Sequence, residues 1–140
     1  MIDPEKKRKR KREWHYTEAG QAFIKRYRAK NAAKISSYLK EWRDSNRLKV
    51  LTFYSNGKLI CSKCGYADHR ALCLDHIENN GAEHRRSLSK GNKRSSGSNS
   101  VYLDLIKTKF PPGFQVLCHN CNFIKEQDRL ASIRKAKYEN

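Results

Sequence analysis

Cys61-Ser62-Lys63-Cys64 has the same form as Cys118-His119-Asn120-Cys121, so the chain carries two Cys-x-x-Cys pairs. Two such pairs supply four thiolates, which is the ligand set of a tetrahedral structural zinc site. Redox-active or simply buried cysteines are the alternative, which two matched pairs in a small basic chain disfavour. His69 and His119 could each replace a cysteine as ligand, although four cysteines already complete the set.

The fifth cysteine, Cys73, lies in the apolar segment Ala71-Leu72-Cys73-Leu74, and we expect it in the core. Four paired cysteines and one single cysteine favour metal ligation over disulfides in a reducing compartment.

The chain has 140 residues, with 31 Lys and Arg against 14 Asp and Glu, so its formal net charge is +17. This length fits one domain with an appended segment, and a hydrophobic content of 37% allows only a modest core. The charge indicates a polyanionic partner, DNA or RNA, with an anionic membrane surface as the alternative. The sequence shows no apolar run of about 18 residues and no signal peptide. We therefore expect a DNA-binding, cytoplasmic protein without membrane association.

The first 50 residues hold the densest positive charge, with 16 Lys and Arg against 6 Asp and Glu. Residues 1–16 include seven consecutive cations, and their repulsion predicts a disordered basic tail. A nuclear localisation signal would have the same composition. Residues 17–50 carry apolar and aromatic residues at helical spacing, so we expect an amphipathic helix with Thr17 as N-cap. Its cations are either a solvated face or DNA contacts, for which the candidates are Arg28, Lys34, Arg43 and Lys49.

Residues 51–140 are expected to form an α+β core around the cysteine pairs. Two short strands are predicted within residues 53–77, with a hairpin turn at Asn56-Gly57. Residues 85–100 are expected to be a flexible basic loop, in which Arg85 and Arg86 are further candidates for DNA contacts. The remaining elements follow in order: a helix over 101–110, a strand over 114–117 and a helix from Asn122 to about Lys137.

Asp75-His76 directly follows the second predicted strand, and these residue types suit phosphodiester cleavage. His is the natural general base near neutral pH, and a carboxylate is a natural ligand for a hard cation such as Mg²⁺. Successive side chains of a strand point to opposite faces, so Asp75 and His76 could address different partners. Taken alone, the dipeptide fits a polar pair at a strand end equally well.

Asn122 follows the cysteine Cys121, and a zinc ion would tie it to the first cysteine pair. Its carbonyl oxygen could be a second ligand for Mg²⁺. Alternatively, its side chain could cap the last helix, a position that Asn favours.

Together these segments resemble zinc-containing HNH endonucleases with a ββα-metal fold. The resemblance covers about residues 58–127 and rests on three segments: Cys61-x-x-Cys64, Leu74-Asp75-His76-Ile77 and Gly113-Phe114-Gln115-Val116-Leu117-Cys118-x-x-Cys121-Asn122-x-x-Lys125. The layout looks most like small phage HNH proteins and is similar in ligand order to the recombination endonuclease VII group. The resemblance implies His76 as general base, Asp75 and Asn122 as ligands of a catalytic cation, and the four cysteines as a structural zinc site.

The chain also departs from this pattern. Gly113 stands where many HNH proteins have an Asn that holds the loop between the strands, and Pro111-Pro112 could stiffen that turn instead. Glu126 lies one turn after Asn122 and could ligate a metal. His84 could contact substrate or metal.

The sequence thus predicts a metal-dependent DNA endonuclease that uses Zn²⁺ for structure and Mg²⁺ or another divalent cation for catalysis. One such site nicks a single strand, whereas a double-strand cut needs a homodimer or two visits. Homing, phage packaging, junction cleavage and host defence are all roles open to such a core. The alternative is a non-catalytic zinc-knuckle protein that binds DNA or RNA, which has no need of Asp75, His76 and Asn122.

Overall fold

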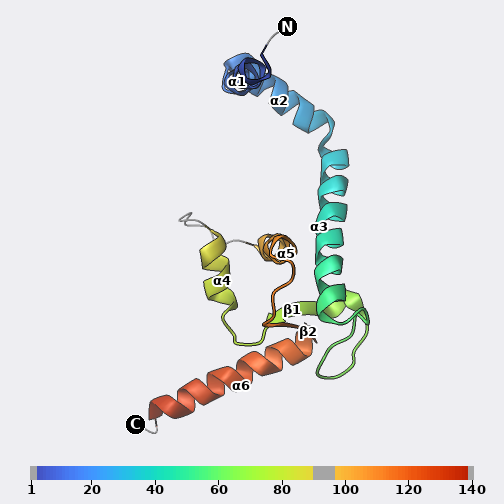
Figure 1. The fold of residues 1–140 in the computed structure, drawn as a ribbon, viewed down its shortest axis with the longest axis vertical. Coiled ribbons are helices and arrows are strands. Elements are labelled where there is room, and N and C mark those ends of the chain that lie inside the picture. The colour runs from blue at the N-terminus through green and yellow to red at the C-terminus, as the bar shows by residue number, and fades with distance from the viewer. Residues whose placement is uncertain (1–2, 90–96, 139–140) are drawn as a thin grey trace. The chain divides into compact units, whose positions relative to one another are not determined.

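The computed structural model describes residues 3–89 and 97–138 (Figure 1). Within these ranges the fold is α+β, with six α-helices and a two-stranded antiparallel sheet, so the expected α+β class is confirmed. The chain divides into two compact units, Met1–Trp42 and Arg43–Asn140. In the described part of the chain, no helix combines the length and apolarity needed to cross a membrane.

The first unit contains α1 (Pro4–His15), α2 (Glu18–Lys30) and the beginning of α3 (Ala32–Tyr54). The expectation of a disordered tail is wrong for α1. The Asp3 side chain accepts a hydrogen bond from the backbone N–H of Glu5, Pro4 occupies the first turn, and Lys and Arg are good helix formers. The cations of α1 are exposed, where water and salt weaken their mutual repulsion.

The single helix expected over residues 17–50 is instead two helices that meet at Asn31. Thr17 caps α2 as predicted, because its Oγ1 accepts a hydrogen bond from the N–H of Gly20 at 3.1 Å. At the other end of α2, the Asn31 side-chain amide donates to the carbonyl oxygen of Tyr27 at 2.8 Å. An Asn side chain that donates a hydrogen bond to a helix carbonyl competes with the backbone for this acceptor and favours termination of the helix.

The first unit has almost no buried surface. Gly20 is its only buried residue within 3–42, and a Cβ at this position would overlap the carbonyl oxygen of Trp14. The aromatic stripe predicted from the sequence is present but exposed, with 51% of Phe23 and 55% of Tyr27 accessible. Burial of this stripe therefore contributes little to the stability of the first unit.

The second unit is built on β1 (Leu72–His76) and β2 (Phe114–Cys118), followed directly by α6 (His119–Tyr138). The strands are antiparallel, with Leu72 opposite Cys118 at one end and His76 opposite Phe114 at the other. Figure 1 shows α6 leaving the end of the sheet. The second predicted strand, the strand over 114–117 and the last predicted helix are therefore present, and two helices lie between the strands.

Two apolar clusters form the core of the second unit. In the first, the end of α3 packs on the sheet through Leu51, Leu72, Val116 and Leu117. In the second, Val50 packs with Val101 and Leu105 of α5 (Ser98–Lys107). Helix α5 also packs against α4 (Gly81–Leu88). Helix α3 is thus a structural part of the core.

The first predicted strand and its hairpin are wrong, because α3 continues through Tyr54. Asn56 and Gly57 do adopt left-handed φ angles of 51° and 79°, but they end a helix instead of joining two strands. The expected core boundary at residue 51 also differs from the structure. Arg47 donates hydrogen bonds to the carbonyl oxygens of His69 and Leu72 at 2.7 and 2.6 Å, so the compact unit already begins at Arg43.

The basic loop expected over residues 85–100 is partly helical. Helix α4 extends through Leu88 and α5 begins at Ser98, while residues 90–96 lie outside the described part of the chain. Helix α5 starts earlier than expected and ends at Lys107, where Lys109 and Phe110 turn the chain with left-handed φ angles. The strand predicted over 114–117 is confirmed.

Candidate functional site

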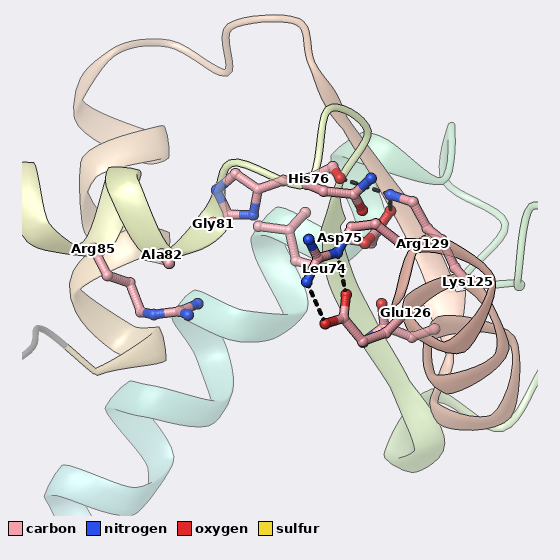
Figure 2. Close-up of a pocket in the computed structure, with 11 residues that line it drawn as sticks. Leu74, Asp75, His76, Gly81, Ala82, Arg85, Lys125, Glu126 and Arg129 are labelled. Carbon is pink, nitrogen blue, oxygen red and sulfur yellow. Dashed lines mark hydrogen bonds and ion pairs between the residues drawn. The ribbon is translucent and has the colours of Figure 1, made fainter. Parts of the chain in front are cut away.

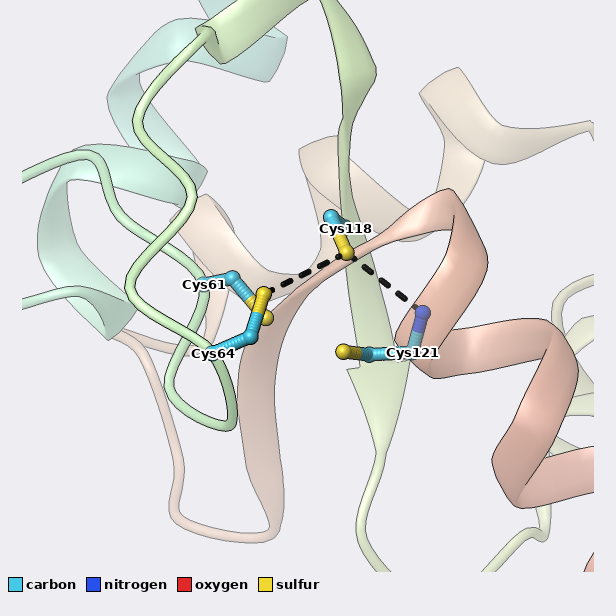
Figure 3. A group of neighbouring side chains, drawn as sticks. All are labelled: Cys61, Cys64, Cys118 and Cys121. Carbon is cyan, nitrogen blue, oxygen red and sulfur yellow. Dashed lines mark hydrogen bonds between the residues drawn. The ribbon is translucent and has the colours of Figure 1, made fainter.

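The four cysteines of the two Cys-x-x-Cys pairs form one cluster, shown in Figure 3. Their sulfur atoms all lie within 4.8 Å of one another, and the sulfurs of Cys64 and Cys118 are 3.8 Å apart. A tetrahedral zinc site with Zn–S bonds of about 2.3 Å requires sulfurs about 3.8 Å apart. The cluster could therefore hold a metal ion such as zinc.

Backbone hydrogen bonds hold the first pair beside the second. The Gly65 N–H donates to the Cys61 carbonyl at 2.9 Å and closes the turn between Cys61 and Cys64. The Ser62 N–H donates to the Val116 carbonyl at 2.8 Å and fixes this turn to β2. Cys118 ends β2 and Cys121 lies in the first turn of α6, so the strand–helix junction supplies the second pair.

The pKa values of two thiols in the cluster are shifted in opposite directions. Burial disfavours the thiolate of Cys61, but hydrogen bonds from the backbone N–H groups of Cys118, Cys64 and Lys63 lower its pKa to about 6. Hydrogen bonds with the sulfurs of Cys118 and Cys64 raise the pKa of Cys121 to about 12. One thiolate is thus available at neutral pH, and a bound cation would displace the remaining protons.

The other candidate ligands stand apart from this cluster. His119 is exposed, and neither His119 nor His69 joins the four sulfurs. Cys73 packs against the core and donates its thiol hydrogen to the Leu117 carbonyl at 3.3 Å. Burial raises the pKa of Cys73 to about 11, in keeping with a neutral core thiol.

A pocket of about 330 Å³ brings the other predicted site residues together (Figure 2). Asp75 and His76 reach it from the end of β1, Asn122 from the first turns of α6, and Arg85 from α4. The complete lining is Leu74, Asp75, His76, Asn79, Gly81, Ala82, Arg85, Asn122, Lys125, Glu126 and Arg129. Asn122 is not the N-cap of α6, because the helix begins at His119.

Asp75 is the one buried charged residue within the described ranges, with 8% of its surface accessible. Its Oδ2 accepts hydrogen bonds from Lys125 Nζ at 2.6 Å and from Gln115 Nε2 at 2.8 Å. Lys125 Nζ also donates to the carbonyl oxygens of His76 and Ile77, at 2.7 and 3.1 Å. Lys125 therefore neutralises Asp75 and joins α6 to the end of β1.

No role was assigned to Lys125 or Gln115 from the sequence, although the position of each residue indicates that it lies near the site. Gln115 is the cross-strand partner of Asp75, and polar partners on one face of a sheet interact. Lys125 lies three residues after Asn122, so the two share a face of α6. Asp75 and Asn122, the two predicted ligands of a catalytic cation, both line this pocket, and their oxygen atoms are of the donor type that Mg²⁺ prefers.

His76 faces away from Lys125 with its imidazole ring. Its Nε2 lies 2.9 Å from Nδ1 of His84, and its ring meets Phe114 edge-on at 4.7 Å between centroids. Burial lowers the pKa of His76, and the neighbouring His84 and Arg85 lower it further. The imidazole is therefore neutral at neutral pH and can accept a proton.

Some of the remaining candidate residues form hydrogen bonds with neighbouring groups, and the others are exposed. Glu126 lines the pocket, but both of its carboxylate oxygens accept hydrogen bonds from Arg129 at 2.7 Å, which lowers its pKa. Arg85 lines the pocket, whereas Arg86 donates to the Ala82 carbonyl. The four cations predicted on the N-terminal helices are all exposed: Arg28, Lys34, Arg43 and Lys49.

Comparison of the chain with protein-family models, curated proteins and solved structures gives no match.

Replacement of Lys125 by Met should lower the free energy of unfolding by about 3 kcal/mol, because the Asp75 carboxylate would remain buried without its counter-charge. Adding Asp75→Asn to this variant should restore part of the loss, since the buried group is then neutral. Urea unfolding of the two single variants and the double variant measures this coupling. Lys63→Met, at an exposed lysine, is the control. Equal stability of Lys125→Met and the original chain would contradict a supporting role for the ion pair.

Proposed function

We propose that the protein is a metal-dependent DNA endonuclease of the HNH type, which hydrolyses phosphodiester bonds and nicks one strand at a time. The observation that carries the proposal is that Asp75, His76 and Asn122 line one pocket. These are the three residues to which the resemblance assigns the chemistry. Asp75-His76 and Asn122 come from two segments far apart in the sequence, and a shared pocket is not expected of unrelated surface groups.

The charges of the pocket also favour a phosphodiester substrate. Arg85, Lys125 and Arg129 line it together with two carboxylates, Asp75 paired with Lys125 and Glu126 paired with Arg129, so the lining has one cation in excess. Cations at this position suit the contact with a phosphate oxygen on either side of the scissile bond. The net charge of +17 supports the attraction of a polyanion to the molecule as a whole.

In the proposed reaction, the neutral imidazole of His76 takes a proton from the attacking water. Asp75 and Asn122 would hold a divalent cation such as Mg²⁺, which when bound stabilises negative charge on the phosphate and leaving oxygens. Lys125 pairs with the Asp75 carboxylate at 2.6 Å in its buried position. Arg85 orients the phosphate from the opposite, α4 side of the pocket.

Four cysteine ligands would complete the coordination of one zinc ion and leave no position for water or substrate. We therefore assign Zn²⁺ a structural role in this function. It would join the Cys61–Cys64 turn to the junction of β2 and α6, and so hold Asn122 near the end of β1.

The first unit is proposed to bind the phosphate backbone of DNA. Residues 1–42 carry 13 Lys and Arg against 5 Asp and Glu, a net charge of +8, and the exposed cations of this unit lie among exposed aromatic side chains. Such a surface suits phosphates of any sequence and also tolerates stacked bases.

Loss of the zinc ligands gives the first test. Cys61→Ser or Cys121→Ser should reduce bound zinc from one ion per chain to none and abolish most of the cooperative unfolding, because metal binding and folding are coupled. Cys73→Ser is the matched control, since its hydroxyl can keep the bond to Leu117 and it lies outside the cluster. Zinc content and thermal unfolding are measured on all three. A folded, zinc-free Cys121→Ser protein would remove the structural role.

Cleavage of supercoiled plasmid in the presence of Mg²⁺ tests the catalytic assignment. His76→Ala should lower the nicking rate by a factor of about 10²–10⁴, because it removes the general base. DNA binding should be retained, because the substitution removes none of the positively charged side chains. Asp75→Asn and Asn122→Ala should also lose cleavage, with partial recovery in excess Mg²⁺. His69→Ala, at an exposed histidine outside the pocket, should nick at the original rate. Binding without any nicking by the original chain would instead support the zinc-knuckle binding protein.

Removal of the first unit tests its proposed role in DNA binding. A chain that begins at Arg43 retains both apolar clusters and the cysteine cluster, so it should fold and keep zinc. Its DNA affinity should be lower and less dependent on salt. The slope of log affinity against log salt concentration should become shallower by roughly 0.9 for each phosphate that the first unit neutralises in the full chain. Binding is measured on one duplex over a range of salt concentrations. An unchanged slope would show that the first unit does not bind phosphates.

A further inference from the structure

Three side chains form a continuous hydrogen-bonded chain behind the catalytic pocket. His76 Nε2 lies 2.9 Å from His84 Nδ1, and His84 Nε2 lies 3.1 Å from Asp104 Oδ2. The three residues come from β1, α4 and α5. They line a second pocket, on the other side of His76 from Asp75 and Lys125, together with Phe114.

The carboxylate at one end sets the direction of every hydrogen bond in this chain. An ionised carboxylate only accepts, so His84 must donate from Nε2. A neutral His84 then accepts at Nδ1, and His76 must donate to it from Nε2. The lone pair of a neutral His76 is consequently left on Nδ1.

The free nitrogen of His76 lies at the catalytic pocket. A Cβ built on Gly81 would stand 3.0 Å from His76 Nδ1, and Gly81 belongs to the lining of that pocket. Within the described ranges, no hydrogen bond occupies Nδ1. The absence of a side chain at Gly81 therefore leaves this nitrogen accessible from the pocket.

The surrounding packing holds the chain in place. The rings of His76 and His84 meet edge-on at 5.2 Å, and Phe114 lies against both, at 4.7 and 5.9 Å between centroids. The His84 side chain is 17% exposed. A ring confined in this way cannot rotate to exchange its two nitrogens without disturbing Phe114.

We propose that His84 and Asp104 are positioning residues, which fix the ring and the tautomer of His76 so that Nδ1 is the basic nitrogen presented to water. Neither residue lines the catalytic pocket, and both act through His76. The consequence for cleavage rests on the proposed nuclease function, whereas the tautomer of His76 does not.

The tautomers can be read directly from long-range ¹H–¹⁵N NMR spectra of the zinc-loaded full chain at neutral pH without Mg²⁺. In the original protein, both His76 and His84 should carry their proton on Nε2. Asp104→Leu should convert both rings to mixtures of tautomers, because the acceptor that sets the direction is lost. A His76 proton on Nδ1 in the original protein, or unchanged tautomers in Asp104→Leu, would overturn the proposal. The spectrum of the original protein decides even if the variant does not fold.

Nicking kinetics give the second readout. Asp104→Leu should lower kcat at least tenfold and leave KM for plasmid DNA unchanged, because a misdirected base affects the reaction and not binding. Glu83→Leu is the matched control, since it removes the same charge from an exposed position in the same pocket and should leave both constants unchanged. A raised KM with unchanged kcat in Asp104→Leu would overturn the positioning role. If the original chain does not nick DNA at all, the nuclease proposal fails, and the NMR result still decides the tautomer.

Discussion

The pairing of β1 with β2 is the constraint on which the rest of the second unit depends. Leu72 lies opposite Cys118 at one end of the sheet, and His76 lies opposite Phe114 at the other. The cysteine cluster is therefore attached to one end of the pair and the proposed catalytic pocket to the other. A slip of one residue would turn Asp75 away from Lys125 and His76 away from His84, because side chains alternate between faces. The hydrogen bond from Ser62 to Val116 adds the Cys61–Cys64 turn to the same register.

The two units obtain their stability in different ways. Helix α1 and helix α2 depend on their caps and on good helix formers, since nothing larger than Gly20 is buried in residues 3–42. The second unit has two small apolar clusters that share the sheet and the end of α3. A core of this size gains much from a local crosslink, and the cysteine cluster lies where β2, α6 and the Cys61–Cys64 turn meet.

Features fixed by local chemistry were predictable from the sequence. The spacing of the four cysteines anticipated their cluster, and the apolar run before Cys118 anticipated β2. The resemblance to HNH endonucleases implied one site for Asp75, His76 and Asn122, and the three residues line one pocket. The prediction of a hairpin at Asn56-Gly57 was wrong. These turn residues do adopt positive φ angles, but the segment before them is a helix that packs Leu51 into the core. In that case tertiary burial outweighed a local turn signal.

The partners of the site residues were less predictable, because they depend on the packing of distant elements. Gln115 follows once the register is known, but His84 and Asp104 meet only because α4 packs on α5 beside β1. The charge run of residues 6–12 was misleading for a similar reason. It indicated repulsion correctly, but a short helix with a capped start keeps those side chains in solvent and tolerates them.

The alternation of side chains along β1 gives the two halves of the proposed site separate supports. Asp75 points to α6 and to its cross-strand neighbour on β2, where Lys125 and Gln115 satisfy its carboxylate. The ring of His76 points to α4 and α5, where His84 and Asp104 complete its hydrogen bonding. The Asp75 carboxylate and the His76 ring are thus held by different elements of the fold. An adjacent acid and base would otherwise pair with each other, and this separation keeps the Asp75 carboxylate and the His76 Nδ1 available for different partners.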